Sequence, residues 1–217
     1  MVLTYWRFRL DQPVNVPRAG FPRHALANIM YDHRVIRAFV DDVSTRASLP
    51  GRFPRFVLRQ YGRAQALRLR GLDDAHPHSL SLVRLLEDLE GVALELGRHE
   101  LVSSFEVPGL ATNAYLALST LDGRSLDPAK LRRDKQELKR TVAAARAFAN
   151  KVAAHADRRV IEGRMERPSW RSDDIEASFP ALDRLTHRYE ALLTGSARSI
   201  TDIGKPEQAW EDFRAEL

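Results

Sequence analysis

One stretch, residues 131–159, constrains the fold of this chain more than any other. It reads LRRDKQELKRTVAAARAFANKVAAHADRR. Its small and apolar side chains recur at steps of seven, four and three residues, the pattern of one buried face on a helix. They are Leu131, Leu138, Val142, Ala145, Ala149 and Val152. The pattern predicts a single long helix, which starts at Asp127 as the capping residue with Pro128 in the first turn.

Three other segments have helical apolar spacing, 25–45, 53–71 and 175–192, and a shorter one covers 80–90. No stretch alternates between polar and apolar residues as strands with hairpin turns do. The sequence therefore predicts an all-α bundle of four principal helices with short additional helices. Residues 91–126 are the least legible part and suggest turns around one or two short helices.

The sequence also predicts local features of the individual helices. The inner face of the 53–71 helix is predicted from Phe56, Gln60, Ala64 and Leu67, and Pro54 is tolerated in its first turn. Ser79 is the predicted N-cap of the 80–90 helix. His33 lies within the apolar stripe of 25–45 and is expected to be a hydrogen-bonded core residue. Pro180 either kinks the last helix or places its start near Ser178, and Gly195 is expected to end it.

The ends of the chain differ from its middle. Residues 1–24 contain Pro13, Pro17, Gly20 and Pro22, which predicts an extended segment that Trp6 and Phe8 dock onto the body. Residues 25–195 form the predicted bundle. The tail, 196–217, carries Trp210 and Phe213, which are expected to pack on the bundle or on a partner.

Composition limits the chemistry. There are no cysteines, which excludes disulfides, thiolate metal sites and cysteine nucleophiles. No apolar run approaches the ~20 residues of a membrane span, and the arginines in the first hydrophobic stretch make a poor signal peptide, so a cytoplasmic location is predicted. The chain has 34 Lys and Arg against 29 Asp and Glu. This balance fits a nucleic-acid partner, but it equally fits an arginine-rich protein from a GC-rich genome.

Four stretches resemble a known family. FANKVAAHADRR at 148–159 resembles the signature helix of HEPN domains, in particular the abortive-infection U-type branch of bacterial phage-defence and toxin–antitoxin systems. LRLRGLDDAHPHSLSLVRLLEDL at 67–89, the Asp127-Pro128 helix start, and LLTG at 192–195 with Trp210 and Phe213 beyond it fit the same branch. The likeness spans residues 25–213. It implies an HEPN-like bundle, a homodimer with the signature residues of two chains facing one cleft, and a metal-independent endoribonuclease without a cofactor.

One position departs from the active pattern. The resemblance implies an arginine that is separated from His155 by a gap of four to six residues. The three positions with these gaps are occupied by Asn150, Ala149 and Phe148. Arg146 is too far back to share a site with His155 on one unbroken helix. The hypothesis is that His155 acts as acid and base, Asn150 orients the phosphate or the 2′-hydroxyl, and Lys151 or a symmetry-related Arg158 stabilises the developing charge. Further RNA contacts are predicted at Arg146, Arg158, Arg159, Arg68 and Arg70.

A structural alternative uses the same residues. In this alternative Asn150 and His155 join the end of the long helix to the 67–74 turn through a polar network. Asp73 or Asp74 is then the partner of His155 or Arg158, and Asp157 belongs to the same network. The missing arginine favours this interpretation, or a non-catalytic module that binds RNA or a partner protein. His76-Pro77-His78 has no further ligand at metal spacing, so no metal site is predicted.

Overall fold

The structure, a computed structural model, describes residues 22–45, 52–77, 79–103, 108–153 and 172–195, with Thr4, Trp6, Phe105 and Glu162. Its helices are α2 (Pro22–Thr45), α3 (Arg52–Gly71), α4 (Leu82–Gly91), α5 (Arg98–Val102), α6 (Gly109–Leu118), α7 (Pro128–Thr141), α8 (Ala143–Phe148) and α10 (Ser172–Thr194). A 3-10 turn, η1 (Ala93–Glu95), and a π-helical turn, η2 (Ala149–Ala153), complete them. Within these residues there is no strand, only an isolated bridge between Ser119 and Leu126. The predicted all-α class is confirmed.

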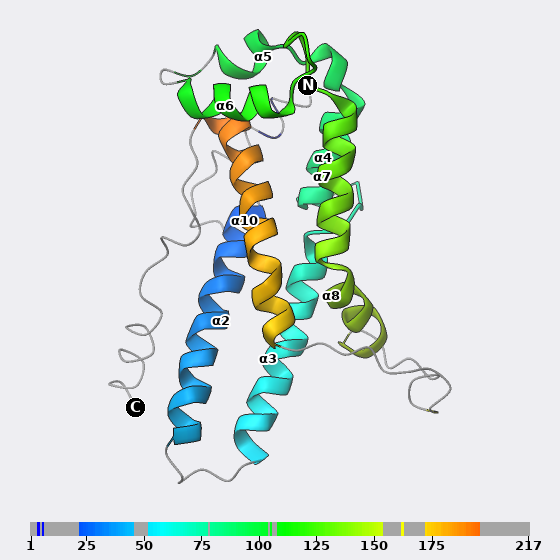
Figure 1. The fold of residues 1–217 in the computed structure, drawn as a ribbon. Coiled ribbons are helices and arrows are strands. Elements are labelled where there is room, and N and C mark those ends of the chain that lie inside the picture. Colours follow the sequence, from blue (N-terminus) through cyan, green and yellow to red (C-terminus); the bar gives the residue numbers. More distant parts are fainter. Residues whose placement is uncertain are drawn as a thin grey trace.

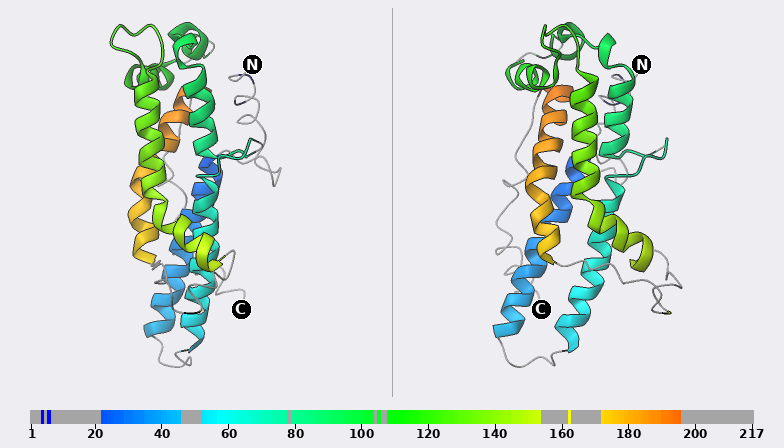
Figure 2. Two further views of the ribbon diagram at one scale, coloured as in Figure 1. Left: turned by 90° about the vertical axis from the view of Figure 1, so that its right-hand side faces the viewer. Right: turned by 45° about the vertical axis from the view of Figure 1, so that its right-hand side comes forward.

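The helices form an elongated bundle in which α10 connects two halves (Figure 1). At one end α10 packs against α2, and α2 packs against α3; towards the other end α10 packs against α7, and α7 against α4. Figure 2 shows α4 continuing the line of α3, with α5 and α6 lying across the end of the bundle. α6 packs on both α5 and α10. The C-terminal half of α10 therefore lies between α6 and α7.

α10 follows its predicted pattern closely. Its apolar stripe is buried throughout: Ile175, Phe179, Leu182, Leu185, Tyr189 and Leu192. The helix begins at Ser172, so the alternative start near Ser178 is wrong. Pro180 lies inside the helix at an exposed position, where the carbonyl freed by the missing N–H can be hydrated. Gly195 ends the helix with φ of 69° and donates its N–H to the oxygen of Ala191 at 3.0 Å.

Side-chain caps set two helix starts. Asp127 accepts a hydrogen bond from the Ala129 N–H at 2.8 Å, with Pro128 in the first turn, as predicted. The predicted cap at Ser79 is wrong. Ser81 Oγ accepts from the Arg84 N–H at 3.1 Å and donates to the oxygen of Asp74 at 2.5 Å. Ser81 therefore caps α4 and also fastens the turn that precedes it.

The 131–159 stretch is not one helix. α7 ends at Thr141, Val142 leaves helical geometry with φ of −95° and ψ of 5°, and α8 starts at Ala143. Leu131, Leu138, Val142, Ala145 and Ala149 are all buried, so the stripe is confirmed as far as Ala149. The side chain of Val152 lies outside the described residues. The break divides the stripe between two partners, because α7 packs on α4 and α10 whereas α8 packs on α3. A straight helix could not follow both.

The predicted inner face of α3 is wrong. Phe56 and Leu67 are 56% and 40% exposed, and Gln60 and Ala64 are exposed as well. Among the side chains of α3 that the structure describes, the buried ones are instead Gln65, Ala66 and Leu69. The buried face is set by the positions of α2, α8 and η2, which pack on α3.

His33 lies in the core, but it is not hydrogen-bonded as predicted. It is 1% exposed, and neither ring nitrogen has a hydrogen-bond partner in the described part of the chain. Its ring meets the edge of Phe179 at 5.5 Å between centroids and lies 6.0 Å from the ring of Tyr61. Burial lowers the pKa of His33 below its ordinary value. The imidazole is therefore kept neutral where α2, α3 and α10 meet.

The beginning of the chain is partly described. Trp6 is buried and donates its indole N–H to Asp88 on α4 at 3.0 Å, so the predicted docking of this residue is confirmed. Thr4 and Trp6 have helical backbone, which differs from the expected extended conformation, and α2 already starts at Pro22. Phe8 and the whole tail, 196–217, lie outside the described residues. Among the helices described, none has a stretch long and apolar enough to cross a membrane.

Candidate anion-binding groove

The residues that the sequence singled out fall only partly within the described chain. His155, Asp157, Arg158 and Arg159 lie outside it. Asn150 and Lys151 lie in the π-helical turn η2, Asn150 exposed and Lys151 half-buried. η2 packs against α3. α3 is the helix that leads into the 67–74 segment.

One ion pair forms the junction between α8 and the turn after α3. Arg146 on α8 donates to the carboxylate of Asp73, in the turn after α3, at 2.5 Å. The Asp73 side chain is 2% exposed, whereas that of Arg146 is 43% exposed. A buried carboxylate needs a charged partner, so this contact is structural. It joins the helices that the predicted polar network was expected to join, but through Arg146, which was predicted to contact RNA.

The other predicted residues near this junction are not gathered into one site. Arg68 pairs with Asp32 on α2. Asp74 accepts from the backbone N–H of His76 at 3.1 Å within its own turn. Arg70 is exposed. The two arginines do not form one patch, because residues two apart on a helix point in different directions.

A basic region that was not predicted from the sequence lies between α7 and α10. Two ion pairs cross this boundary: Arg188 with Asp134 at 2.7 Å, and Arg184 with Glu137. Tyr189, fully buried, also donates its hydroxyl to Asp134 at 2.7 Å. Burial and the adjacent Asp134 carboxylate raise the pKa of Tyr189. The hydroxyl therefore remains a proton donor across the neutral range, and Asp134 holds both helices together.

Three further cations line the same face of α7. Lys130, Arg133 and Arg140 have no carboxylate partner among the described residues. Lys130 donates to the backbone oxygen of Ser119 at 2.6 Å. Arg133 and Arg140 each reach only a carbonyl one turn back on their own helix, at 3.4 Å. Their spacing of three and seven residues keeps them on one side of the helix.

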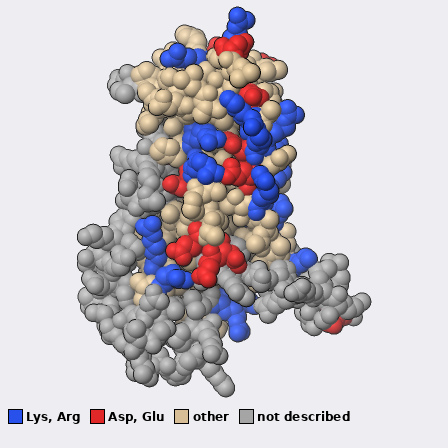
Figure 3. Space-filling model, in the orientation of Figure 1, with Lys and Arg blue, Asp and Glu red and all other residues tan. Residues whose placement is uncertain are grey.

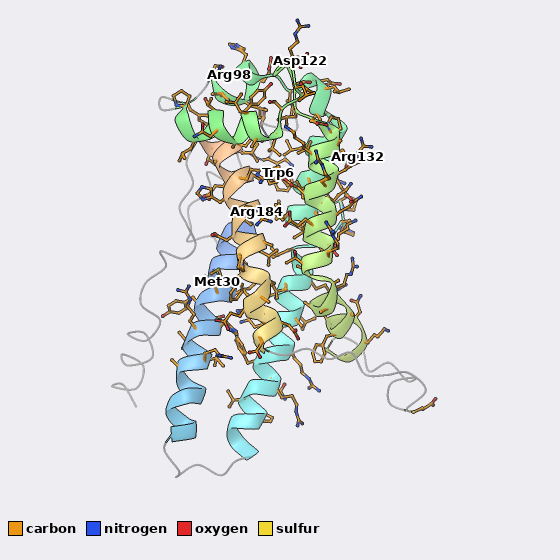
Figure 4. All side chains as sticks on the ribbon, viewed as in Figure 1. Trp6, Met30, Arg98, Asp122, Arg132 and Arg184 are labelled. Carbon is orange, nitrogen blue, oxygen red and sulfur yellow. The ribbon has the colours of Figure 1, made fainter. Side chains whose placement is uncertain are left out.

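These residues line a hollow of about 420 Å³, which we call the α7–α10 groove. Its lining is Ala117, Leu118, Lys130, Arg133, Asp134, Glu137, Arg140 and Arg188. Figure 3 shows Lys and Arg side chains on both sides of a row of acidic ones in this region, and Figure 4 labels Arg184 on the α10 side. The two acidic groups are engaged by Arg188 and Arg184, so the groove has an excess of positive charge.

A second hollow, of about 460 Å³, adjoins the groove and is called here the α6–α10 hollow. Both hollows are lined by Ala117 and Arg188. The remaining lining of the second is Leu110, Asn113, Ala114, Pro180, Asp183, Arg184, His187 and Ala191. Five of its ten lining side chains are apolar, and the other five are polar or charged.

The arrangement is suited to binding an extended anion. Guanidinium groups without a carboxylate partner bind phosphate in a fixed fork geometry. In the described part of the chain, no group of three or more His, Asp or Glu side chains is placed to hold a metal ion. The sequence did contain a signal for the groove, since Lys130, Arg133 and Arg140 already show helical spacing. It did not show that Arg184 and Arg188 lie opposite them.

Comparison of the chain with known proteins does not assign it to a family. No protein-family model matches it. No curated protein matches it, and no solved structure does.

Proposed function

We propose that this protein is an HEPN-like, non-catalytic RNA-binding module that holds the phosphate backbone in the α7–α10 groove. The observation that carries the proposal is the row of Lys130, Arg133 and Arg140 on α7 without carboxylate partners in the described chain. Phosphate contacts supply most of the sequence-independent affinity for nucleic acid. The surplus of Lys and Arg over the whole chain agrees with such a partner.

Fluorescence anisotropy with a labelled single-stranded RNA of 16 nucleotides, at several salt concentrations, tests this proposal. The Arg133→Gln/Arg140→Gln variant should bind more weakly, and its plot of log affinity against log salt should be shallower by about 1.4, because each phosphate contact on a single strand contributes about 0.7. The matched control is Arg59→Gln/Arg98→Gln, which removes two exposed arginines outside the groove. No binding by the wild type, or tighter binding to DNA of the same sequence, would contradict the proposal.

A second candidate function is RNA cleavage at the signature stretch. The observation that favours it is η2, the π-helical turn that contains Asn150 and Lys151 a few residues before His155. Short π-helical turns are rare and occur often at functional sites. In this proposal His155 transfers protons, Asn150 orients the substrate and Lys151 stabilises the charge that develops on the phosphate.

Expression in bacteria and incubation of purified protein with RNA distinguish the two candidates. A ribonuclease of the abortive-infection or toxin–antitoxin kind should slow growth, and His155→Ala should relieve this while the purified variant still binds RNA. A module without catalysis should be harmless and leave RNA intact. Asn150→Ala is a useful second variant because Asn150 is exposed, so its replacement leaves the fold intact.

The resemblance also carries the proposal of a homodimer. Analytical ultracentrifugation of the purified protein measures this directly, and a monomer at micromolar concentration would contradict it. Addition of RNA in the same experiment separates a pre-formed dimer from two copies gathered on one strand. A partner protein in place of RNA remains the alternative, and it predicts no binding in the anisotropy measurement.

A further inference from the structure

Two hollows of different chemistry adjoin one another beside α10. The α7–α10 groove is lined mainly by charged side chains, whereas half of the side chains that line the α6–α10 hollow are apolar. Arg188 lines both and is fixed by Asp134 at 2.7 Å. A ligand with negative charge at one end and a flat or apolar group at the other matches the two hollows together.

The α6–α10 hollow has the features of a site for such a group. Leu110, Ala114, Pro180 and Ala191 supply apolar surface, and its volume of about 460 Å³ lies within the range of small-molecule pockets. Half-buried His187 offers an aromatic ring on which a base can stack. Asn113, exposed at the rim, offers an amide that can both donate to and accept from a base edge.

We infer that the α6–α10 hollow receives one unpaired base of a single-stranded RNA whose phosphates lie in the α7–α10 groove. This inference rests on the proposed RNA-binding function and names its substrate class. In a duplex the bases are stacked and paired inside the helix, so they cannot enter a side pocket without being flipped out. Sequence-tolerant recognition of single strands combines a basic groove with a stacking surface, and here the two features share Arg188 and Ala117.

Binding of four probes that all carry phosphates tests the inference. The probes are a single-stranded RNA of 16 nucleotides, its duplex, an abasic oligomer of the same length and inorganic polyphosphate. The single strand should bind most tightly. His187→Ala should weaken its binding about tenfold, the size expected from the loss of one stacked base, and should leave binding of the abasic oligomer and polyphosphate unchanged. His99→Ala, an exposed histidine on α5, is the matched control.

A second variant guards against a folding defect at position 187. Asn113→Trp places a bulky ring at an exposed position of the hollow, so it should preserve the fold, which far-ultraviolet circular dichroism checks. It should selectively weaken the binding of single-stranded RNA. Equal affinity for the four probes, or no effect of either variant, would overturn the inference while leaving the proposed function standing. Binding of AMP or UMP as tight as that of the oligomer would also overturn it. Failure of the wild type to bind RNA or polyphosphate would remove the proposed function itself.

Discussion

Asp134 on α7 faces Arg188 on α10 at 2.7 Å, and this pair joins two helices that are 54 residues apart in the sequence. Tyr189 donates to the same carboxylate. Asp134 is 8% exposed, so its carboxylate depends on these two contacts more than on water. The pair forms one wall of the α7–α10 groove and places Arg188 between the groove and the neighbouring hollow.

Asp134→Ala should therefore destabilise the fold strongly. It leaves Arg188 and the Tyr189 hydroxyl without their acceptor, and breaking a buried charged pair typically costs about 3 kcal/mol or more. Urea denaturation followed by circular dichroism measures the free energy of unfolding. Glu137→Ala is the matched control, because its pair with Arg184 is largely exposed and should be worth less than about 1 kcal/mol. Equal losses in the two variants would argue against the central position of Asp134.

Gly195→Ala should destabilise the end of α10 for two reasons. The residue has φ of 69°, and an added Cβ would lie 2.7 Å from the ring of Phe105. Left-handed backbone costs about 1–2 kcal/mol for a residue with a Cβ, and crowding adds about 1–3 kcal/mol. Gly123→Ala separates the two terms, since Gly123 has φ of 67° but open space around its Cβ position. The loss in melting temperature should be larger for Gly195→Ala.

Ser81→Ala should cost about 1 kcal/mol, the usual value of a helix N-cap. Ser81 both caps α4 and donates to the oxygen of Asp74. Ser79→Ala, two residues away, should be close to neutral, since the cap is at Ser81. The comparison of the two variants by thermal unfolding decides between the predicted and the observed cap. A greater loss at Ser79 would contradict the observed geometry.

Stability should fall as the pH drops through the range where histidine titrates. Burial lowers the pKa of His33, and the Glu176 and Asp173 carboxylates offset this in part while Arg37 and Arg34 add to it. The unfolded chain therefore binds a proton that the folded chain resists. The contribution of His33 to the free energy of unfolding should be constant above about pH 6.5. At lower pH it should decrease by up to about 1.4 kcal/mol per pH unit. His33→Leu should flatten this slope, whereas exposed His99→Gln should retain it.

Arg146→Ala should lower stability because the Asp73 carboxylate, almost fully buried, loses its cation. The expected loss is about 1–3 kcal/mol. Arg70→Ala, at an exposed position on α3, should stay within about 0.5 kcal/mol. A double-mutant cycle of Arg146→Ala with Asp73→Ala should give a smaller loss than the sum of the single variants. Additive losses would mean that the two residues act independently.

The sequence predicted local features where neighbouring residues decide them. The Asp127 cap, Gly195 at the end of α10 and the buried stripe from Ile175 to Leu192 are confirmed. Each depends on backbone geometry within one or two turns or on a single, unambiguous apolar stripe. The stripe from Leu131 to Ala149 is also confirmed, because its residues are small or apolar whichever helix they meet.

Predictions that depend on a partner helix failed. α3 has apolar side chains on more than one face, and periodicity cannot choose between Phe56 and Leu69. The break at Val142 has the same origin, since α7 and α8 must reach different neighbours. The groove was missed for a related reason: the cations of α7 show helical spacing, but only the antiparallel packing of α10 brings Arg184 and Arg188 opposite them.

The sequence alone determined that this chain is helical, where several of its helices begin and end, and that it carries an excess of basic residues. These properties follow from short-range spacing, capping and composition. The tertiary structure decided which face of each helix is buried, which arginines are engaged by carboxylates and which remain available in the α7–α10 groove. The physical reason is that the energy of a side chain depends on what lies against it, and residues far apart along the chain provide those contacts.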